Sequence, residues 1–334
     1  MGSKHRLLPW LHGIFANLDF STVADPFCGS ASVAYLLKCM GKSVHASDFL
    51  NFPTTIAAAV VANSVETLSP DDTKALLKPS TDHDRFIEQT FGGIFFSVPD
   101  LHFLDTLWGN LGQIGGSGRR ALALTAAIRA CMKRQPRGVF TVANDVGGGG
   151  RYQDGRRDLQ LSLRDHFLEQ VELLNRLVFD NGLRHSAERR DAFGEAPSNP
   201  PDLVYLDPPY VPRADDNCYV KRYHFLEGLS CYWQGVKIMP DSKVRKIEKK
   251  FTPFSYRRTA LDAFDRLFQK YRASTIVLSY SENGYPDRSV IGELLGRYKR
   301  AVTVHERAHR YHFGNHANVS RAETTEYVMV GVGE

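Results

Sequence analysis

Residues 21–48 read STVADPFCGSASVAYLLKCMGKSVHASD, and they predict a strand, a turn, a helix and a second strand in that order. A β-prone run comes first, and turn-forming residues follow at Asp25–Ser30. Good helix formers fill Ala31–Cys39, and Ser43–Ser47 is the second β-prone run. Such a βαβ unit predicts an α/β fold with a parallel sheet, in which ligands bind at the carboxyl ends of the strands.

The rest of the chain contains two kinds of sequence. From about Ser64 to Arg164 the alternation of strands and helices is missing, and it resumes after Gly182. We therefore predict an α/β domain formed by residues 1–63 and 165–334, with a mostly helical subdomain, residues 64–164, inserted into it. The further elements that we expect are helices at Thr54–Asn63, Arg119–Lys133, Leu159–Phe179, Ala260–Tyr271 and Val290–Arg297, and strands at Leu183–Arg190, Leu203–Leu206, Ser274–Tyr280, Ala301–His305 and Tyr327–Val332.

The most informative short segment is Asp207-Pro208-Pro209-Tyr210, which follows the apolar run Leu203–Leu206. The Asp207 carboxylate and the Pro208 carbonyl form a rigid pair of acceptors, because the proline rings restrict the backbone of the turn. Tyr210 adds an aromatic face beside them. Two acceptors and a stacking ring suit a planar ring that carries an exocyclic amine. The same four residues are also compatible with an ordinary turn that has no function.

A second candidate site is the turn Asp25–Ser30 together with Asp48. Gly29 lies between a strand and a helix, where backbone N–H groups can face a bound ligand. Asp48 ends the second strand, where an acid accepts hydrogen bonds from ribose hydroxyls; its alternative role is that of a solvated strand-end or capping residue. The chain lacks both G-x-G-x-x-G and G-x-x-x-x-G-K-[ST], which argues against NAD, FAD and nucleoside triphosphates as ligands.

Taken together, these motifs resemble those of the Dam-like, α-group DNA adenine methyltransferases, and they occur in the same order. The matching segments are Gly2–Trp10, Phe27–Ser30, Asp48, Asp191, Asp207–Tyr210, Ser279–Ser281 and Arg321–Tyr327. The resemblance implies a Rossmann-like S-adenosylmethionine-dependent methyltransferase sheet, with residues 64–164 as a target-recognition subdomain. The chain departs from the family at two places. Ala31 stands where the family often has glycine, and the opening motif of the family usually has residues ahead of Gly2, so we expect a trimmed N-terminus or weaker contacts there.

The resemblance also implies a role for each matching residue. S-adenosylmethionine is expected to bind to Lys4, Phe27, Gly29, Ser30, Asp48 and Asp191. The catalytic residues are expected to be Asp207, Pro208, Pro209 and Tyr210. The substrate is expected to be an adenine flipped out of duplex DNA. Asp207 and the Pro208 carbonyl would accept the two amine hydrogens and stabilise the charge that develops during methyl transfer, without a metal.

The distribution of charge indicates where DNA binds. The whole chain carries a net charge of +5, whereas residues 119–164 contain ten Lys and Arg and three Asp, which leaves −2 for the remainder. We expect this insertion to contact double-stranded DNA, mainly its phosphates, through Arg134, Arg137, Arg151 and Arg157. Tyr223 lies in the aromatic and basic run Tyr219–Phe225, which we interpret as a mobile loop that closes over the flipped base. The alternative is a surface helix whose aromatic side chains are anchored in the core.

Several alternatives remain open at this point. The same two acceptors fit the exocyclic amine of cytosine or an adenine in RNA, and an inactive DNA-binding subunit with the same fold is a third alternative. A cognate restriction enzyme is a candidate partner. No apolar run approaches the ~20 residues of a membrane helix, and residues 1–8 do not resemble a signal peptide, so we expect a cytoplasmic protein without a membrane partner.

Overall fold

The computed structural model divides into two compact units. The described residues are 4–79, 84–136, 138–143, 155–211, 219–249, 251–310 and 323–334. The sheet unit contains Ser3–Phe49, Leu183–Cys218 and Lys250–Glu334, and the helical unit contains Leu50–Gly182 and Tyr219–Lys249. The helical unit is thus larger than the predicted insertion, because the residues on both sides of 64–164 and a later segment pack within it.

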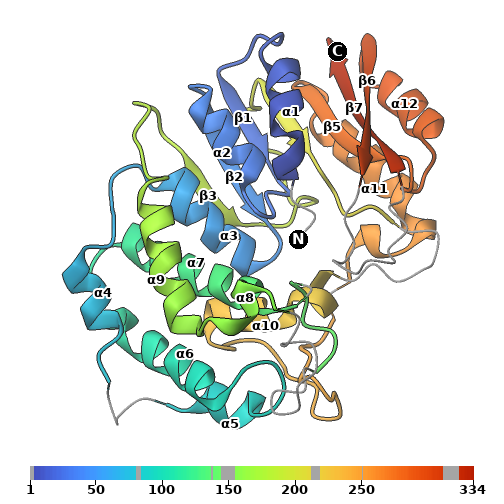
Figure 1. Ribbon diagram of the computed structural model, residues 1–334. Helices are drawn as coiled ribbons and strands as arrows, with labels where there is room; N and C mark the ends of the chain where they lie inside the picture. The colour runs from blue at the N-terminus through green and yellow to red at the C-terminus, as the bar shows by residue number, and fades with distance from the viewer. Residues whose placement is uncertain are drawn as a thin grey trace. The chain divides into compact units, whose positions relative to one another are not determined.

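The sheet unit is built on seven strands that lie side by side in the order β3-β2-β1-β4-β5-β7-β6 (Figure 1). The strands are β1 (Thr22–Asp25), β2 (Ser43–Asp48), β3 (Ser186–Arg189), β4 (Leu203–Leu206), β5 (Thr275–Ser281), β6 (Ala301–Arg310) and β7 (Glu323–Val332). The first five strands in this order pair in parallel, whereas β7 is antiparallel to both β5 and β6. The predicted α/β fold is confirmed. The predicted parallel sheet is confirmed for five strands, whereas β7 runs antiparallel to both of its neighbours.

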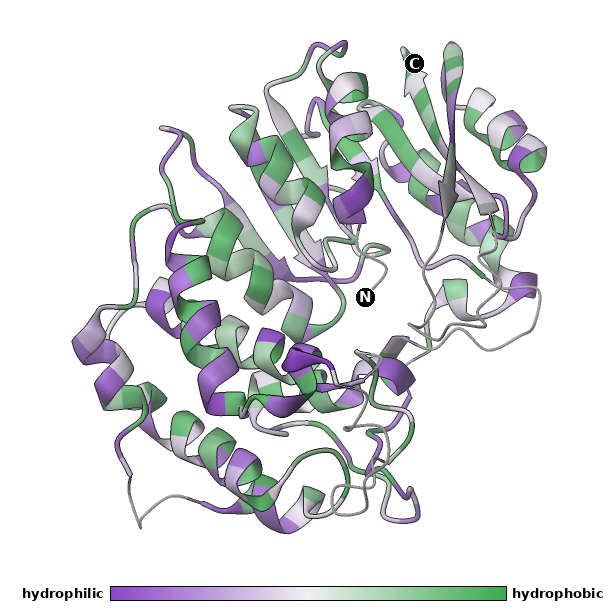
Figure 2. Ribbon diagram, in the orientation of Figure 1, coloured by the Kyte–Doolittle hydropathy of each residue, from purple (hydrophilic) through white to green (hydrophobic). Residues whose placement is uncertain are grey.

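Buried apolar side chains hold the sheet and its helices together. All four residues of β4 are buried. On helix α11 (Arg257–Lys270), Ala260, Phe264 and Leu267 are buried, and their spacing of three to four residues places them on one face. Figure 2 shows hydrophobic residues along the strands of this unit. The other helices of the unit are η1 (Lys4–Leu7), α1 (Leu8–Phe15), α2 (Ser32–Cys39), η4 (Pro253–Ser255) and α12 (Arg288–Gly296).

The helical unit has its own core. Its helices are α3 (Asn51–Ala57), the π-helical turn η2 (Ala58–Ala62), α4 (Pro70–Leu76), α5 (Phe86–Phe91), α6 (Val98–Asn110), η3 (Leu111–Gln113), α7 (Ser117–Arg134), α8 (Arg157–Gln160), α9 (Leu163–Asn175) and α10 (Tyr219–Cys231). Helix α7 packs against α9. Phe225 of α10 is fully buried, and its ring contacts Phe91 at a centroid distance of 5.0 Å and Phe140 at 5.1 Å.

The predicted loop at Tyr219–Phe225 is therefore wrong, because this run forms the first turns of helix α10. Its aromatic side chains are needed in the core of the helical unit, as the alternative interpretation held. In the described part of the chain, no helix is both long and apolar enough to cross a bilayer.

Candidate active site

Three carboxylates lie at the carboxyl ends of adjacent parallel strands in the sheet unit. Asp25 ends β1, Asp48 ends β2, and Asp207 comes directly after β4. From β1 the chain continues outward to β2 and β3, whereas β4 pairs with the other side of β1. The direction of the strand order thus reverses between β1 and β4. Open α/β sheets bind their ligands at such a point, outside the carboxyl ends of the strands.

Asp207 belongs to a network of four polar side chains. The Lys4 ammonium lies 3.3 Å from Asp207 Oδ1, 3.2 Å from Glu326 Oε2 and 2.6 Å from the Tyr210 hydroxyl, to which it donates a hydrogen bond. The Tyr210 hydroxyl in turn donates to Asp207 Oδ1 at 3.1 Å. Within the described residues, the contacts of Asp207 with Lys4 and Tyr210 are both made by Oδ1, so that Oδ2 is left to accept a hydrogen bond from a substrate.

Burial and charge together set the protonation of this aspartate. Burial raises the pKa of Asp207, the Lys4 ammonium lowers it, and the Glu326 carboxylate raises it again. The Asp207 side chain nevertheless keeps 19% of its surface exposed, whereas Lys4 keeps 7% and Glu326 none. Among the three charged members of the network, Asp207 is thus the one that an incoming group can reach. A carboxylate with a raised pKa is also a stronger hydrogen-bond acceptor, which suits an amine donor.

The expected glycine turn connects β1 to α2. The backbone N–H of Gly29 donates to Asp48 Oδ2 at 3.1 Å, and Gly29 has a φ of +50°, in the left-handed region that favours glycine. Ala31 lies in the same region, with a φ of +57°. This explains why glycine is frequent at that position in the family that the sequence resembles. Burial also raises the pKa of Asp25 well above its ordinary value, and Asp207 and Asp48 act in the same direction.

Three aromatic rings lie beside this turn, those of Phe27, Phe193 and Phe254, and we call them the aromatic wall. The ring of Phe254 contacts the ring of Phe27 at a centroid distance of 5.9 Å and that of Phe193 at 5.7 Å. Phe193 follows Asp191, whose carboxylate accepts a hydrogen bond from the Phe193 N–H at 3.0 Å. Asp191 itself is exposed. Phe27 and Phe193 are half-buried and offer apolar surface to a flat ring, Phe254 is buried and supports both rings, and the Asp191 carboxylate lies at the edge.

The structure places the other predicted residues as follows. Lys4, expected to bind the cofactor, contacts the expected catalytic residues Asp207 and Tyr210. Pro208 is buried and Pro209 is half-buried in the turn after β4. The Ser30 hydroxyl lies 2.6 Å from that of Ser32.

The five residues expected to contact DNA differ in where they lie. Arg137 and Arg151 lie outside the described residues. Arg134 is largely buried and faces Asp100 at 3.8 Å, and Arg157 forms an ion pair with Glu169. Tyr223 is 4% exposed, and its ring contacts Phe52 at 5.8 Å.

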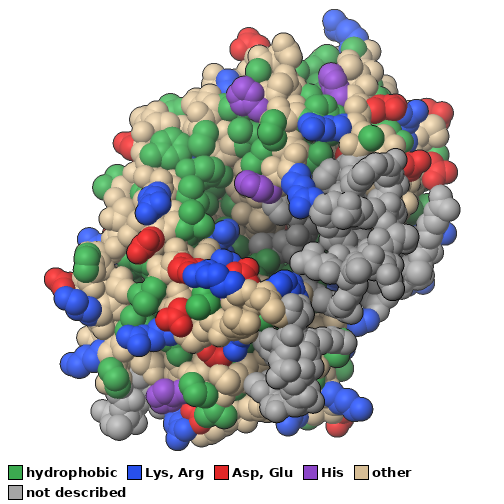
Figure 3. Space-filling view, viewed as in Figure 1, with side chains coloured by type: hydrophobic (Ala, Val, Ile, Leu, Met, Phe, Trp, Pro, Cys, Tyr) green, Lys and Arg blue, Asp and Glu red, His purple; other side chains and the backbone are tan. Residues whose placement is uncertain are grey.

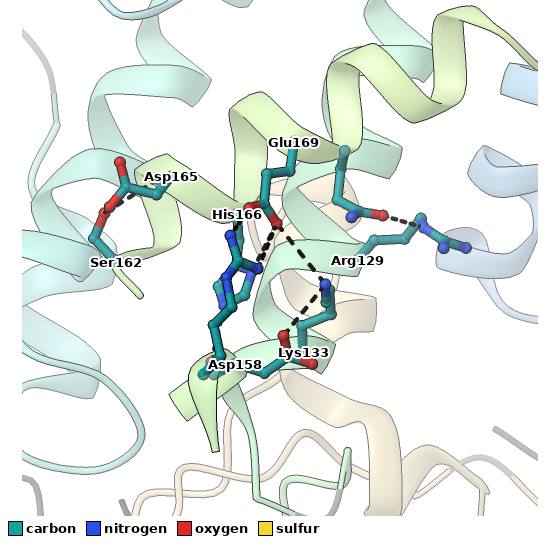
Figure 4. Close-up of polar contacts among 9 residues, drawn as sticks. Arg129, Lys133, Asp158, Ser162, Asp165, His166 and Glu169 are labelled. Atoms are coloured by element: carbon teal, nitrogen blue, oxygen red, sulfur yellow. Dashed lines mark hydrogen bonds and ion pairs between the residues drawn. The ribbon is translucent and has the colours of Figure 1, made fainter. Parts of the chain in front are cut away.

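Neighbouring cations of the predicted basic segment are also engaged with polar groups. Lys133 lies 3.4 Å from Asp158 and 3.9 Å from Glu169, and Arg129 donates to the Gln170 side chain (Figure 4). Figure 3 shows acidic and basic side chains interspersed on the face of the helical unit that it presents. The local charge of this segment is therefore partly balanced by acids within the same unit.

Sequence reasoning missed two groups of residues at the site. Glu326 lies in a segment that resembles the family, but nothing in its immediate sequence indicates a contact with Lys4. Phe193 and Phe254 carry no signal that separates them from other core aromatics. The sequence identifies Asp25 as the first residue of the turn. Only the structure shows that Asp25 is buried, which distinguishes it from an ordinary turn aspartate.

Comparison with known proteins agrees with this geometry. The model of the D12 class N6 adenine-specific DNA methyltransferases matches residues 1–272. The chain is also 27% identical over 321 residues to the type II methyltransferase M2.HphI of Haemophilus parahaemolyticus, and the match covers 93% of this chain and 90% of that protein. The family description specifies adenine in DNA, which favours that substrate over cytosine or RNA. The chain belongs to the D12 class of N6 adenine-specific DNA methyltransferases.

Proposed function

We propose that this enzyme transfers a methyl group from S-adenosylmethionine to the exocyclic amine of an adenine flipped out of duplex DNA, with Asp207 as the central catalytic residue. The observation that supports this most directly is the network around Asp207. Lys4 and Tyr210 both hold Oδ1, so that the carboxylate is fixed and presents Oδ2 as an acceptor. A fixed acceptor stabilises charge that develops on the amine at no reorganisation cost during the reaction.

The residues beside Asp207 fit S-adenosylmethionine. The cofactor carries a sulfonium cation, and Asp48 and Asp207 place carboxylates at one edge of the sheet. Asp48 is suited to the ribose hydroxyls, and its carboxylate is oriented by the Gly29 N–H. The wall of Phe27, Phe193 and Phe254 is suited to the adenine ring of the cofactor, with Asp191 at its edge. When bound, the cofactor supplies an electrophilic methyl group.

The residues of this chain would act on the amine in two ways. Asp207 Oδ2 and the Pro208 carbonyl accept its two hydrogens, which favours the pyramidal form whose lone pair can attack the methyl group. As the C–N bond forms, the bond between the methyl carbon and the sulfonium sulfur would break and leave S-adenosylhomocysteine, and the Asp207 carboxylate would stabilise the positively charged nitrogen until one of its protons passes to solvent. Tyr210 would stack on the flipped base and offset part of the few kcal/mol, roughly, that unstacking costs.

We further propose that the enzyme is Dam-like and that it serves as the modification enzyme of a restriction system. The order of the motifs supports the first statement. The similarity to a type II methyltransferase over most of both chains supports the second, and a cognate restriction enzyme would then recognise the same DNA sequence.

The proposed function is tested by expressing the full chain in a host without DNA methylation and sequencing its genome by a method that detects modified bases. We expect N6-methyladenine at one short recurring sequence. Its absence, together with DNA binding by the purified protein, would favour the inactive DNA-binding subunit. Methylated cytosine would identify the other amine as the substrate.

Substitution of Asp48 tests the cofactor site separately. We expect Asp48→Asn to weaken S-adenosylmethionine binding by about 10-fold to 100-fold, because a hydrogen bond to a charged group contributes about 1.5–3 kcal/mol. Isothermal titration calorimetry measures the affinity directly. Glu293→Gln, which removes an exposed carboxylate from α12 in the same unit, is the matched control and should bind like the unmodified enzyme. Equal affinities for the two variants would contradict the assignment of Asp48.

A further inference from the structure

Exposed aromatic and basic side chains lie close together around the start of helix α11 on the sheet unit. Phe251 and Tyr256 are 61% and 37% exposed, and their rings are stacked at a centroid distance of 5.6 Å with an interplanar angle of 23°. The Arg258 guanidinium lies 5.4 Å from the centroid of the Tyr256 ring, and Arg257 is also exposed. We call these four residues the aromatic-basic patch. Two large exposed rings beside two guanidinium groups are typical of a binding surface rather than of a core.

The arginines of this patch keep their charge available. Residues 249–258 contain four Lys and Arg and no acidic residue. Within the described residues, neither Arg257 nor Arg258 forms an ion pair with a carboxylate, whereas Arg134 faces Asp100 and Arg157 pairs with Glu169. A cation that is already paired gains less from a phosphate than one facing only aromatic rings. On this ground the patch is better suited to a polyanion than Arg134 and Arg157 of the predicted insertion.

Two contacts connect the patch to the active site. Phe254, within the same segment, is buried against Phe27 of the glycine turn. Arg257 lies 4.7 Å from the centroid of the Tyr285 ring, and the Tyr285 N–H donates to the carbonyl of Val211 at 3.1 Å. Val211 directly follows Tyr210. The patch is thus anchored to both segments that form the site of methyl transfer.

We propose that the aromatic-basic patch binds the DNA strand that carries the target adenine. Arg257 and Arg258 neutralise phosphates beside the flipped nucleotide, and the stacked rings of Phe251 and Tyr256 pack against its neighbouring sugar or base. The proposal rests on the proposed function, because it takes the base that reaches Asp207 to belong to DNA. It assigns DNA contacts to the sheet unit, in addition to those expected from the insertion.

The test compares the full-length double variant Arg257→Gln/Arg258→Gln with Arg297→Gln/Arg300→Gln. The control removes the same charge from exposed arginines elsewhere on the sheet unit. Fluorescence anisotropy with a labelled 30-base-pair duplex of mixed sequence, from 50 to 200 mM KCl, gives the slope of log Kd against log salt. We expect the slope to fall by about 1.8 in the patch variant, which corresponds to two phosphate contacts, and to stay unchanged in the control. S-adenosylmethionine affinity should be unchanged in both.

A third variant, Phe251→Leu/Tyr256→Leu, separates the rings from the charges. We expect Kd to rise by roughly 5-fold or more, since base stacking contributes about 1–3 kcal/mol per base, while the salt slope stays the same. The proposal is overturned if both patch variants bind DNA with the affinity and salt slope of the control. The binding assay does not depend on methyl transfer. If the arginine variant lowers the salt slope but the unmodified enzyme does not methylate DNA, the proposed function alone is refuted. If the unmodified enzyme methylates DNA but both patch variants bind it like the control, the patch alone is refuted.

Discussion

Asp207→Ala is expected to lower kcat for methyl transfer to DNA by about 10³-fold or more, because removal of a single transition-state hydrogen-bonding group costs about 10²–10³ in kcat and Asp207 also supplies charge. Lys4 should remain in place, because Glu326 still holds its ammonium at 3.2 Å. Affinity for S-adenosylmethionine should change little. Transfer of a labelled methyl group to DNA measures the loss, and calorimetry measures cofactor binding.

The matched control is Asp262→Ala, which removes an exposed carboxylate from α11 of the same unit. It should methylate DNA at the rate of the unmodified enzyme. Asp207→Asn refines the test, because it keeps the size of the side chain and removes its charge; we expect an intermediate rate. Near-normal transfer by Asp207→Ala would show that the amine is bound elsewhere.

Lys4→Met is expected to move the acid limb of the kcat profile to higher pH. The Lys4 ammonium lowers the pKa of Asp207, so without it that pKa rises and the carboxylate form, which the reaction needs, is lost at a higher pH. The same substitution leaves the Glu326 carboxylate buried without this partner, and we expect it to reduce the free energy of unfolding by about 3–5 kcal/mol. Kinetics from pH 5 to 9 and chemical denaturation give the two quantities.

The double variant Lys4→Met/Glu326→Gln distinguishes the two effects of Lys4. Neutralising Glu326 removes the buried charge that has lost its ammonium, so most of the lost stability should return. It also removes a charge that raises the pKa of Asp207, but the effect of Lys4 on that pKa is the larger one, so the acid limb should stay at higher pH than in the unmodified enzyme, by less than in Lys4→Met. If the double variant regains both the stability and the original pH profile, Lys4 has a structural role only and does not position Asp207.

Most of the fold could be predicted because its signals are local. The strands Thr22–Asp25 and Ser43–Asp48 and the helix between them occur within one or two residues of the positions expected from composition and turn residues. The direction of β7 could not be predicted, because strand direction depends on which neighbours pair in space. The helix at Tyr219–Phe225 could not be predicted either, because it also depends on neighbours in space: Phe225 packs among aromatic rings from other segments.

The candidate site was predictable where a residue acts from the end of a strand. Asp48 and Asp207 each follow a β-prone run, and parallel strands bring such positions together. Glu326 could not be predicted, because its contact with Lys4 depends on the position of β7 in the sheet. Local charge does not reveal which cations are already paired, since the acids that face Arg134 and Arg157 come from other helices of the unit.

The ion pair between Lys4 and Glu326 has a consequence for synthesis of the enzyme, because it joins residues 322 positions apart in the sequence. Closing a loop of that length costs about 5 kcal/mol of chain entropy. Strand β7, which carries Glu326, also has to enter the sheet between β5 and β6. A ribosome-bound chain can therefore expose the first strands, the glycine turn and Asp207 long before Asp207 acquires its final surroundings. The surroundings of Asp207 can therefore be completed only after β7 has been synthesised.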